Sequence, residues 1–190
     1  MKQILLGLCF AMLAMDCRSD QQSEPTQTEA DKAKAAIKEL AVALKTELKG
    51  AMQAGGPVAA IGVCNTQAIP ITQTVANEQS LRLSRVSLKN RNPTNLPNEW
   101  QIAVLEGFEQ QKAAGKDIGS LVWSETVNVD GKQEFRFMKA IPTAAVCLSC
   151  HGTDLSPDVS RILADLYPMD RATGYREGDI RGAFVATGKP

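Results

Sequence analysis

The feature that constrains this chain most is the pentapeptide Cys147-Leu148-Ser149-Cys150-His151. Two thiols three positions apart can reach the two vinyl groups on one edge of a porphyrin, and the adjacent imidazole then lies beneath the iron. The spacing therefore predicts one haem c, attached covalently through Cys147 and Cys150. His151 is the predicted proximal ligand of the iron.

Two other kinds of site share part of this pattern. A thioredoxin-like dithiol does not need a histidine directly after the second cysteine. A structural zinc site needs further Cys or His ligands. His151 is the one histidine of the chain, and Cys64 is the one cysteine outside both the motif and the N-terminal segment. A closed zinc site of three cysteines and His151 is thus the remaining alternative.

The residues alone leave the opposite iron position open. It cannot be histidine, because none remains. A single cysteine is usually a buried apolar thiol, and methionines usually fill the core. The candidates are Cys64, Met52, Met138, Met169, a lysine, water, or no ligand at all.

The N-terminal residues predict export. A charged start, a short apolar run and a rise in polarity are typical of a signal peptide over residues 1–17. The apolar run is too short to span a membrane. Cys17, at the end of this segment, suggests a lipid anchor as an alternative, although Asp16 stands where a small residue is usual. Residues 18–29 are predicted as a polar tether and residues 30–190 as one domain. We therefore expect a periplasmic or otherwise exported protein.

Composition excludes one class of partner. The chain of 190 residues has no net charge and 44% apolar residues, as expected for a globular domain. Its basic cluster, Arg82, Arg85, Lys89 and Arg91, has no interleaved aromatic residues, so we do not expect a nucleic-acid surface. The cluster is either a solvated edge or, together with Asn92, a set of partners for the haem propionates.

The hydrophobic pattern predicts an α+β fold with an antiparallel sheet. The Asp130-Gly131 pair between two alternating runs is a strong hairpin signal, because that turn requires positive φ at both residues. A hairpin before a late haem motif argues against the small helical cytochromes c and the four-helix type. The expected elements are a helix over 37–52 stopped at 55–57, a helix from Asn65 to Val75, a strand from Leu81, a helix from Asn98 to Gly115, the hairpin 121–141, a helix over 159–166 and a strand over 180–186.

Residues 35–188 resemble a known family. The chain is similar to the cyanobacterial-type c-haem domain with a PAS-like fold, which occurs as a free periplasmic protein and as the sensor domain of signalling receptors. The segments that carry the resemblance are Ile61-Gly62-Val63-Cys64, Arg82-Leu83-Ser84, Arg91 to Asn95 with Pro97 and Trp100, Cys147 to Gly152, and Gly174-Tyr175 with Gly178 to Ala183.

The resemblance implies a ligand set and a fold. In that family the motif histidine and a cysteine hold the iron, and the cysteine at the matching position is Cys64. The family also implies a five-stranded antiparallel sheet flanked by helices.

A thiolate ligand would place negative charge on the iron and lower its reduction potential. We expect redox or gas sensing, or electron transfer, with an unidentified redox or signalling protein as partner and a small gaseous ligand in the sensing case. The alternative is a plain soluble electron carrier. An enzyme is not expected, because peroxidase-like chemistry needs a second acid–base residue, usually histidine.

Overall fold

The computed structural model describes residues 27–188. The predicted signal peptide 1–17, Cys17 and most of the predicted tether 18–29 lie outside the described residues. The first helix begins at Gln27, so the end of the predicted tether is helical. Among the described residues, no helix has both the length and the apolar character needed to cross a bilayer.

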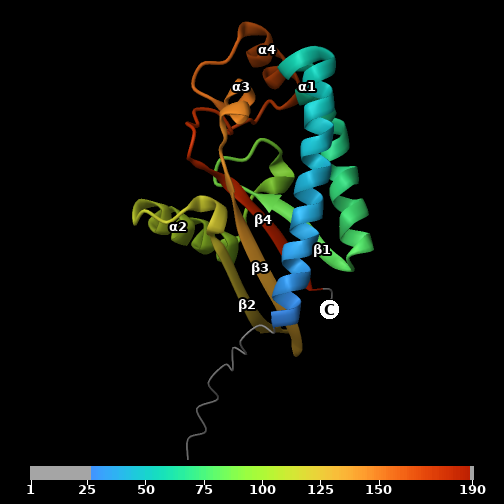
Figure 1. Ribbon diagram of the computed structural model, residues 1–190, viewed down its shortest axis with the longest axis vertical. Coiled ribbons are helices and arrows are strands. Elements are labelled where there is room, and N and C mark those ends of the chain that lie inside the picture. Colours follow the sequence, from blue (N-terminus) through green and yellow to red (C-terminus); the bar gives the residue numbers. More distant parts are fainter. Residues whose placement is uncertain (1–26, 189–190) are drawn as a thin grey trace, which may run out of the picture.

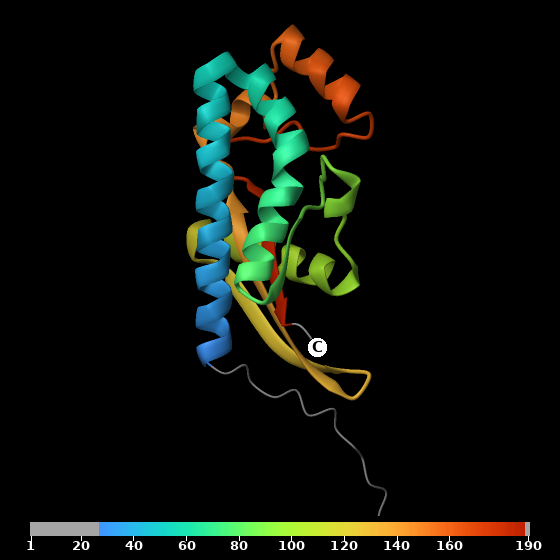
Figure 2. The same ribbon diagram turned by 90° about the vertical axis from the view of Figure 1, so that its right-hand side faces the viewer.

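Helix α1 (Gln27–Glu78) consists of two helical halves joined by a sharp turn at Gly55 and Gly56. Gly56 has a φ of 68°, which L-residues with a side chain adopt at a cost. The two halves run antiparallel and side by side, as Figures 1 and 2 show. The predicted stop at 55–57 is confirmed. The predicted start at Asn65 is wrong, because Pro57 lies inside the renewed helix and proline is well accepted in a first helical turn.

The four strands form one antiparallel sheet in the order β1-β4-β3-β2. The hairpin forms as predicted, with positive φ at both Asp130 and Gly131. The described residues contain four strands, one fewer than the five that the resemblance implies. The bounds are β1 Leu81–Val86, β2 Val122–Val129, β3 Lys132–Pro142 and β4 Ile180–Gly188.

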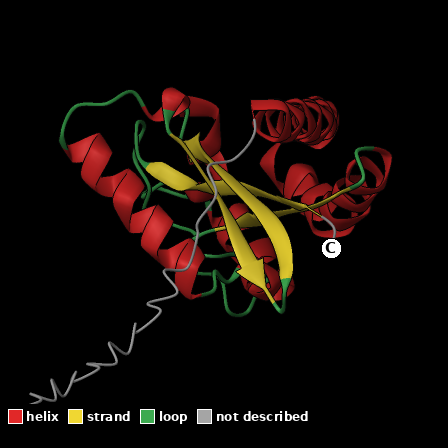
Figure 3. Cartoon of the chain, turned by 90° about the horizontal axis from the view of Figure 1, so that it is seen from below, coloured by secondary structure: helices red, strands yellow, loops and turns green. Residues whose placement is uncertain are grey.

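Helices cover both faces of the sheet (Figure 3). Along β3, Phe135 and Phe137 pack against the first half of α1. Met138 and Ala140 face the other way, toward α2 (Glu99–Ala113). This alternation is the expected period of a strand that is buried on both faces. The predicted α+β fold with an antiparallel sheet flanked by helices is confirmed, including the start of α2, where Asn98 forms a capping box.

The haem motif lies at one end of this sheet. α3 (Leu148–His151) and α4 (Pro157–Leu166) are found near the turn of α1 in Figure 1. Ile61 of α1 packs with Val159 and Leu163 of α4, and Cys150 borders this cluster. The cluster brings the second half of α1 against the motif. The short 3-10 helices are η1 Pro93–Asn95, η2 Ile118–Ser120 and η3 Ala145–Cys147.

Gly182 shows how closely β4 approaches the end of β1. A Cβ at position 182 would overlap the Val86 carbonyl oxygen, and the φ of Gly182 is 152°. We expect Gly182→Ala to lower the free energy of unfolding by about 1–3 kcal/mol, as overpacking does. Denaturant titration measures the change.

The matched control is Gly107→Ala, because a Cβ at position 107 of α2 would meet nothing within 4 Å. This control is expected to stabilise the protein by about 0.5–1 kcal/mol, the helix preference of alanine over glycine. If both variants were as stable as the parent, the close approach at Gly182 would be contradicted.

Candidate functional site

The two motif cysteines lie on a continuous turn of chain. η3 ends at Cys147, and α3 carries Cys150 and His151 directly after it. Both thiols are free and partly buried. Two free thiols one turn apart are the arrangement that thioether attachment to one edge of a porphyrin requires.

One backbone group orients the His151 ring. Its Nδ1 lies 2.7 Å from the carbonyl oxygen of Ala172. The Nδ1–H therefore donates, and Nε2 keeps its lone pair. Burial lowers the pKa of His151 to about 3, and the charges of Arg181 and Arg91 act in the same direction. The imidazole is neutral at pH 7, with Nε2 as the nitrogen available to a metal.

The segment after Ala172 braces the motif from the same side. The Tyr175 amide donates to the His151 carbonyl at 2.9 Å, and the Gly174 amide donates to the Gly152 carbonyl at 2.9 Å. The Tyr175 ring lies edge-on to the imidazole, with 6.3 Å between ring centroids. These contacts hold the backbone of His151 and bound one edge of its ring.

Arg91 follows β1 and joins the motif to the Ala172 segment. Its Nε donates to Asp170 at 3.0 Å, and its Nη2 donates to the carbonyl oxygens of Cys150 and Ala172. The guanidinium also lies 5.8 Å from the centre of the Tyr167 ring. Arg91 was predicted to face the haem propionates, but the structure shows donors directed at the motif backbone. A contact with propionates stays a prediction.

Cys64 is brought into the neighbourhood of the motif. It lies on α1 one turn after Ile61, which packs in the cluster bordered by Cys150. The side chain is exposed, yet surrounding protein desolvates the sulfur enough to raise the pKa of the Cys64 thiol. The charges of Arg85 and Arg91 oppose that rise. A negative charge on Cys64 in turn raises the pKa of Cys150, so the two sulfurs interact electrostatically.

The methionines are placed differently. Met138 is fully buried, between the sheet and α2, on the face away from α1. It is therefore not available to an iron held by His151. Met169 is 65% exposed and lies two residues after Tyr167. Met52 lies in α1 just before the turn. Of the methionines proposed as ligands, Met169 and Met52 remain.

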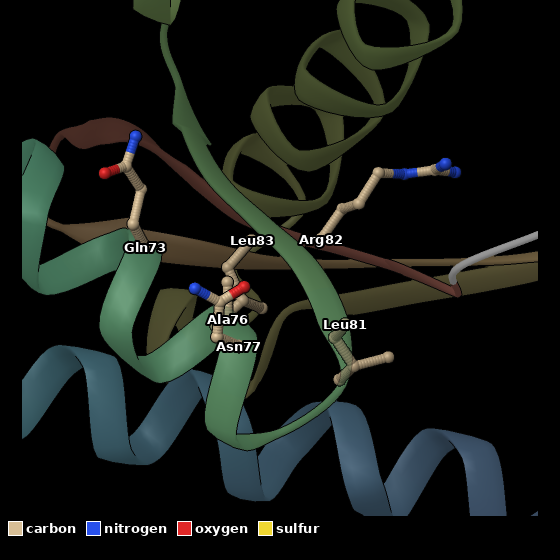
Figure 4. A pocket seen from close by; sticks show the side chains of 6 residues that line it. All are labelled: Gln73, Ala76, Asn77, Leu81, Arg82 and Leu83. Carbon is tan, nitrogen blue, oxygen red and sulfur yellow. The ribbon is translucent and has the colours of Figure 1, made fainter.

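The other residues predicted to contact the haem propionates lie in different places in the fold. Arg85 lies near Cys64, since the two charges influence each other. Arg82 is not brought to the site: it bonds to Glu134 and Thr187 and lines an open hollow of about 420 Å³ between α1 and β1 (Figure 4). The Asn92 side-chain oxygen caps η1, so its polar group already has a local structural role.

Sequence reasoning assigned no role of their own to two residues at the site, Tyr175 and Arg181. The Lys89 ammonium and the Arg181 guanidinium lie 5.1 and 5.2 Å from the centre of the Tyr175 ring. Arg181 also acts electrostatically on His151. Tyr175 and Arg181 belong to a segment that carried the family resemblance, and that was the one signal in the sequence that could have found them.

The donor set of the site fits a haem better than a bare metal ion. Within residues 27–188, no three His, Cys, Asp or Glu side chains gather so that they could hold a metal. This counts against the zinc alternative. A porphyrin supplies four nitrogens of its own, so the protein needs to provide only axial ligands and, in haem c, two thiols. His151, Cys147 and Cys150 meet that need.

Comparison with known proteins agrees with the fold. The crystal structure of the cyanobacterial heme-protein Tll0287 is similar, with a TM-score of 0.61 and 23% sequence identity. The match covers 87% of this chain and 97% of that one. At this identity the likeness concerns the fold.

Two comparisons of the sequence concern curated proteins and protein families. No protein in the curated set matches this chain. The family model described as Tll0287-like matches residues 19–187, which is nearly the whole chain. The chain therefore belongs to the Tll0287-like family.

Proposed function

We propose that this protein is an exported c-type cytochrome in which Cys147 and Cys150 hold one haem covalently and His151 binds the iron. The observation that carries the proposal is the bond from His151 Nδ1 to Ala172, which leaves Nε2 available beside two free thiols. The structural likeness to a protein described as a heme-protein supports it. The bound haem would supply one-electron redox chemistry.

Cys64 is the proposed ligand on the opposite side of the iron. Its electrostatic link to Cys150 supports this role, and the burial of Met138 on the far face removes one competitor. A thiolate adds a negative charge to the iron and favours the ferric state. We therefore propose a low reduction potential.

The physiological role that we propose is redox or gas sensing, or electron transfer, through an unidentified protein partner. Cys64 lies on the half of α1 that begins at the Gly55–Gly56 turn. A change in its bond to the iron would act directly on this half-helix. That arrangement supports sensing, since the first half of the same helix packs against the sheet.

The ferrous protein is expected to bind carbon monoxide. A thiolate bond weakens when the iron is reduced, because the metal loses one unit of positive charge. An exposed side chain such as Cys64 can then move away. The measurement is the visible absorption spectrum of the reduced protein with and without carbon monoxide.

Cys64→Ala is the matched control for this experiment, since it has no thiolate to displace. If the variant binds carbon monoxide and the parent does not, sensing by ligand release is excluded. A plain electron carrier would then be the better description.

The alternative as a plain carrier is favoured by one observation. Arg91 donates to the carbonyl oxygens of Cys150 and Ala172, and the Ala172 carbonyl also accepts from His151. A proximal side held by this network suits electron exchange with little rearrangement. Peroxidase-like chemistry is not proposed, because the chain's one histidine is already the proximal ligand.

Export is part of the proposal. Residues 1–17 would direct the chain to the periplasm, with Cys17 as a lipid anchor in the alternative case. The mass of the mature N-terminus distinguishes cleavage from lipidation.

A further inference from the structure

A largely buried ion pair lies beside His151. Arg91 Nε and Asp170 Oδ2 are 3.0 Å apart, and their side chains are 11% and 10% exposed. Burying two charges costs desolvation free energy, which further hydrogen bonds must offset. In this protein those bonds converge on the backbone around His151.

The backbone of Ala172 is bound on both sides of its Cα by this pair. Its N–H donates to Asp170 Oδ1 at 2.7 Å. Its carbonyl oxygen accepts from Arg91 Nη2 at 3.3 Å and from His151 Nδ1 at 2.7 Å. Arg91 Nη2 also donates to the carbonyl of Cys150. One guanidinium thus binds the carbonyl that orients the imidazole and the carbonyl just before His151.

A shared acceptor divides its electron density between its donors. The Ala172 carbonyl has two lone pairs, and a cationic donor on one of them makes it a weaker acceptor for the other. A weaker acceptor leaves the His151 ring with less imidazolate character. Less negative charge on the proximal ligand favours the ferrous state, because second-shell hydrogen bonds tune ligand basicity.

We propose that Arg91, held in place by Asp170, is a positioning residue for His151 that fixes the imidazole through the Ala172 carbonyl and raises the reduction potential of the bound iron. The inference rests on the proposed haem function and adds the residues that regulate it. It concerns groups that bind neither the iron nor a substrate.

The charge-removing variants should shift the midpoint potential in opposite directions. Arg91→Gln removes a positive charge and frees the Ala172 carbonyl for His151, so its potential falls. Asp170→Asn keeps a side-chain oxygen that accepts from Arg91 Nε but removes a negative charge, so its potential rises. At a fixed ambient potential, each change alters the ferric-to-ferrous ratio by about tenfold, the scale of a partly buried charge near a redox centre. Spectroelectrochemical titration of the purified holoprotein measures both.

Arg91→Lys separates charge from geometry. Lysine keeps the charge but cannot bind two carbonyls and a carboxylate with a planar fork. We expect a lower potential than the parent and a changed ferric electron paramagnetic resonance spectrum, which reports the imidazole orientation. Arg82→Gln is the matched control, because Arg82 pairs with Glu134 away from the site; its potential should equal that of the parent.

The outcomes separate this inference from the proposed function. If the parent carries no covalent haem, the proposed function fails. If the parent carries haem but the Arg91 and Asp170 variants titrate like Arg82→Gln, this inference alone is overturned. If Arg91→Lys keeps the parental potential and spectrum, Arg91 acts through its positive charge alone, and its role in positioning His151 is overturned.

A measurement on the unmodified holoprotein tests the inference even if the variants fail to fold. The His151 Nδ1 proton, shielded by Ala172, should exchange slowly with solvent in nuclear magnetic resonance spectra. Exchange as fast as that of an exposed imidazole would overturn the inference.

Discussion

Replacing both Cys147 and Cys150 with serine is expected to abolish covalent haem attachment. A serine hydroxyl does not form the thioether that joins a cysteine to a haem vinyl group. Each single variant keeps one thiol and should retain a weakened, one-bond attachment. The measurement is haem staining after denaturing electrophoresis, which removes any haem that is not covalently bound.

Cys64→Ser is the matched control for that loss. It removes a thiol from the same neighbourhood but not from the attachment motif. The control should keep its haem through denaturation while the double variant shows none. Covalent haem in the double variant would mean that the motif is not the attachment site.

Cys64→Ala is expected to change the ferric spectrum and raise the reduction potential. Loss of the thiolate leaves the iron without its strong opposite ligand, so the low-spin ferric signal should be lost or replaced. Axial ligands set haem potentials over about 0.8 V, and removing a full negative charge should raise the potential by on the order of 0.1 V. Electron paramagnetic resonance and potentiometric titration measure the two effects.

Thr66→Ala provides the comparison on the same helix. Thr66 is exposed, and within residues 27–188 its hydroxyl group hydrogen-bonds to the backbone of its own helix and to Gln67. Its variant should have the parental spectrum and potential. If Cys64→Ala also keeps the parental low-spin spectrum, Cys64 is not the ligand, and Met169 becomes the next candidate.

The parts of the fold that sequence reasoning predicted depend on neighbouring residues. The turn at Asp130 and Gly131 follows from the positive φ that both residues tolerate. The start of α2 follows from Asn98 and Gln101, three positions apart. The wrong helix start at Asn65 was also predicted from neighbouring residues alone. Asparagine favours helix starts, but the helix had already restarted at Pro57.

The site depended on contacts that no local pattern contains. Arg91 reaches Cys150 across 59 positions and Asp170 across 79. Arg82 and Arg91 looked equivalent in the basic cluster, but a strand rises about 3.3 Å per residue and separates them along the sheet. Membership of the same basic cluster gave both the same expected role. In the structure Arg82 lies within β1, whereas Arg91 lies beyond the end of β1 and bonds to the Cys150 carbonyl.

The same limit applies to the residues around His151. Neither the Ala172 carbonyl nor its amide is visible in a sequence as a functional group. Tyr175 and Arg181 carried a family resemblance but no role, because their contacts with His151 and Ser87 depend on how β4 is placed. The motif itself could be predicted, since five adjacent residues supply its whole chemistry.

The most direct test of the central claim is the intact mass of the purified, denatured protein, followed by the masses of its proteolytic peptides. We expect one added haem per chain, carried by the peptide that contains Cys147 and Cys150, on a chain that has lost residues 1–17 or carries lipid at Cys17. A chain with its unmodified mass, or a haem on a different peptide, would contradict it.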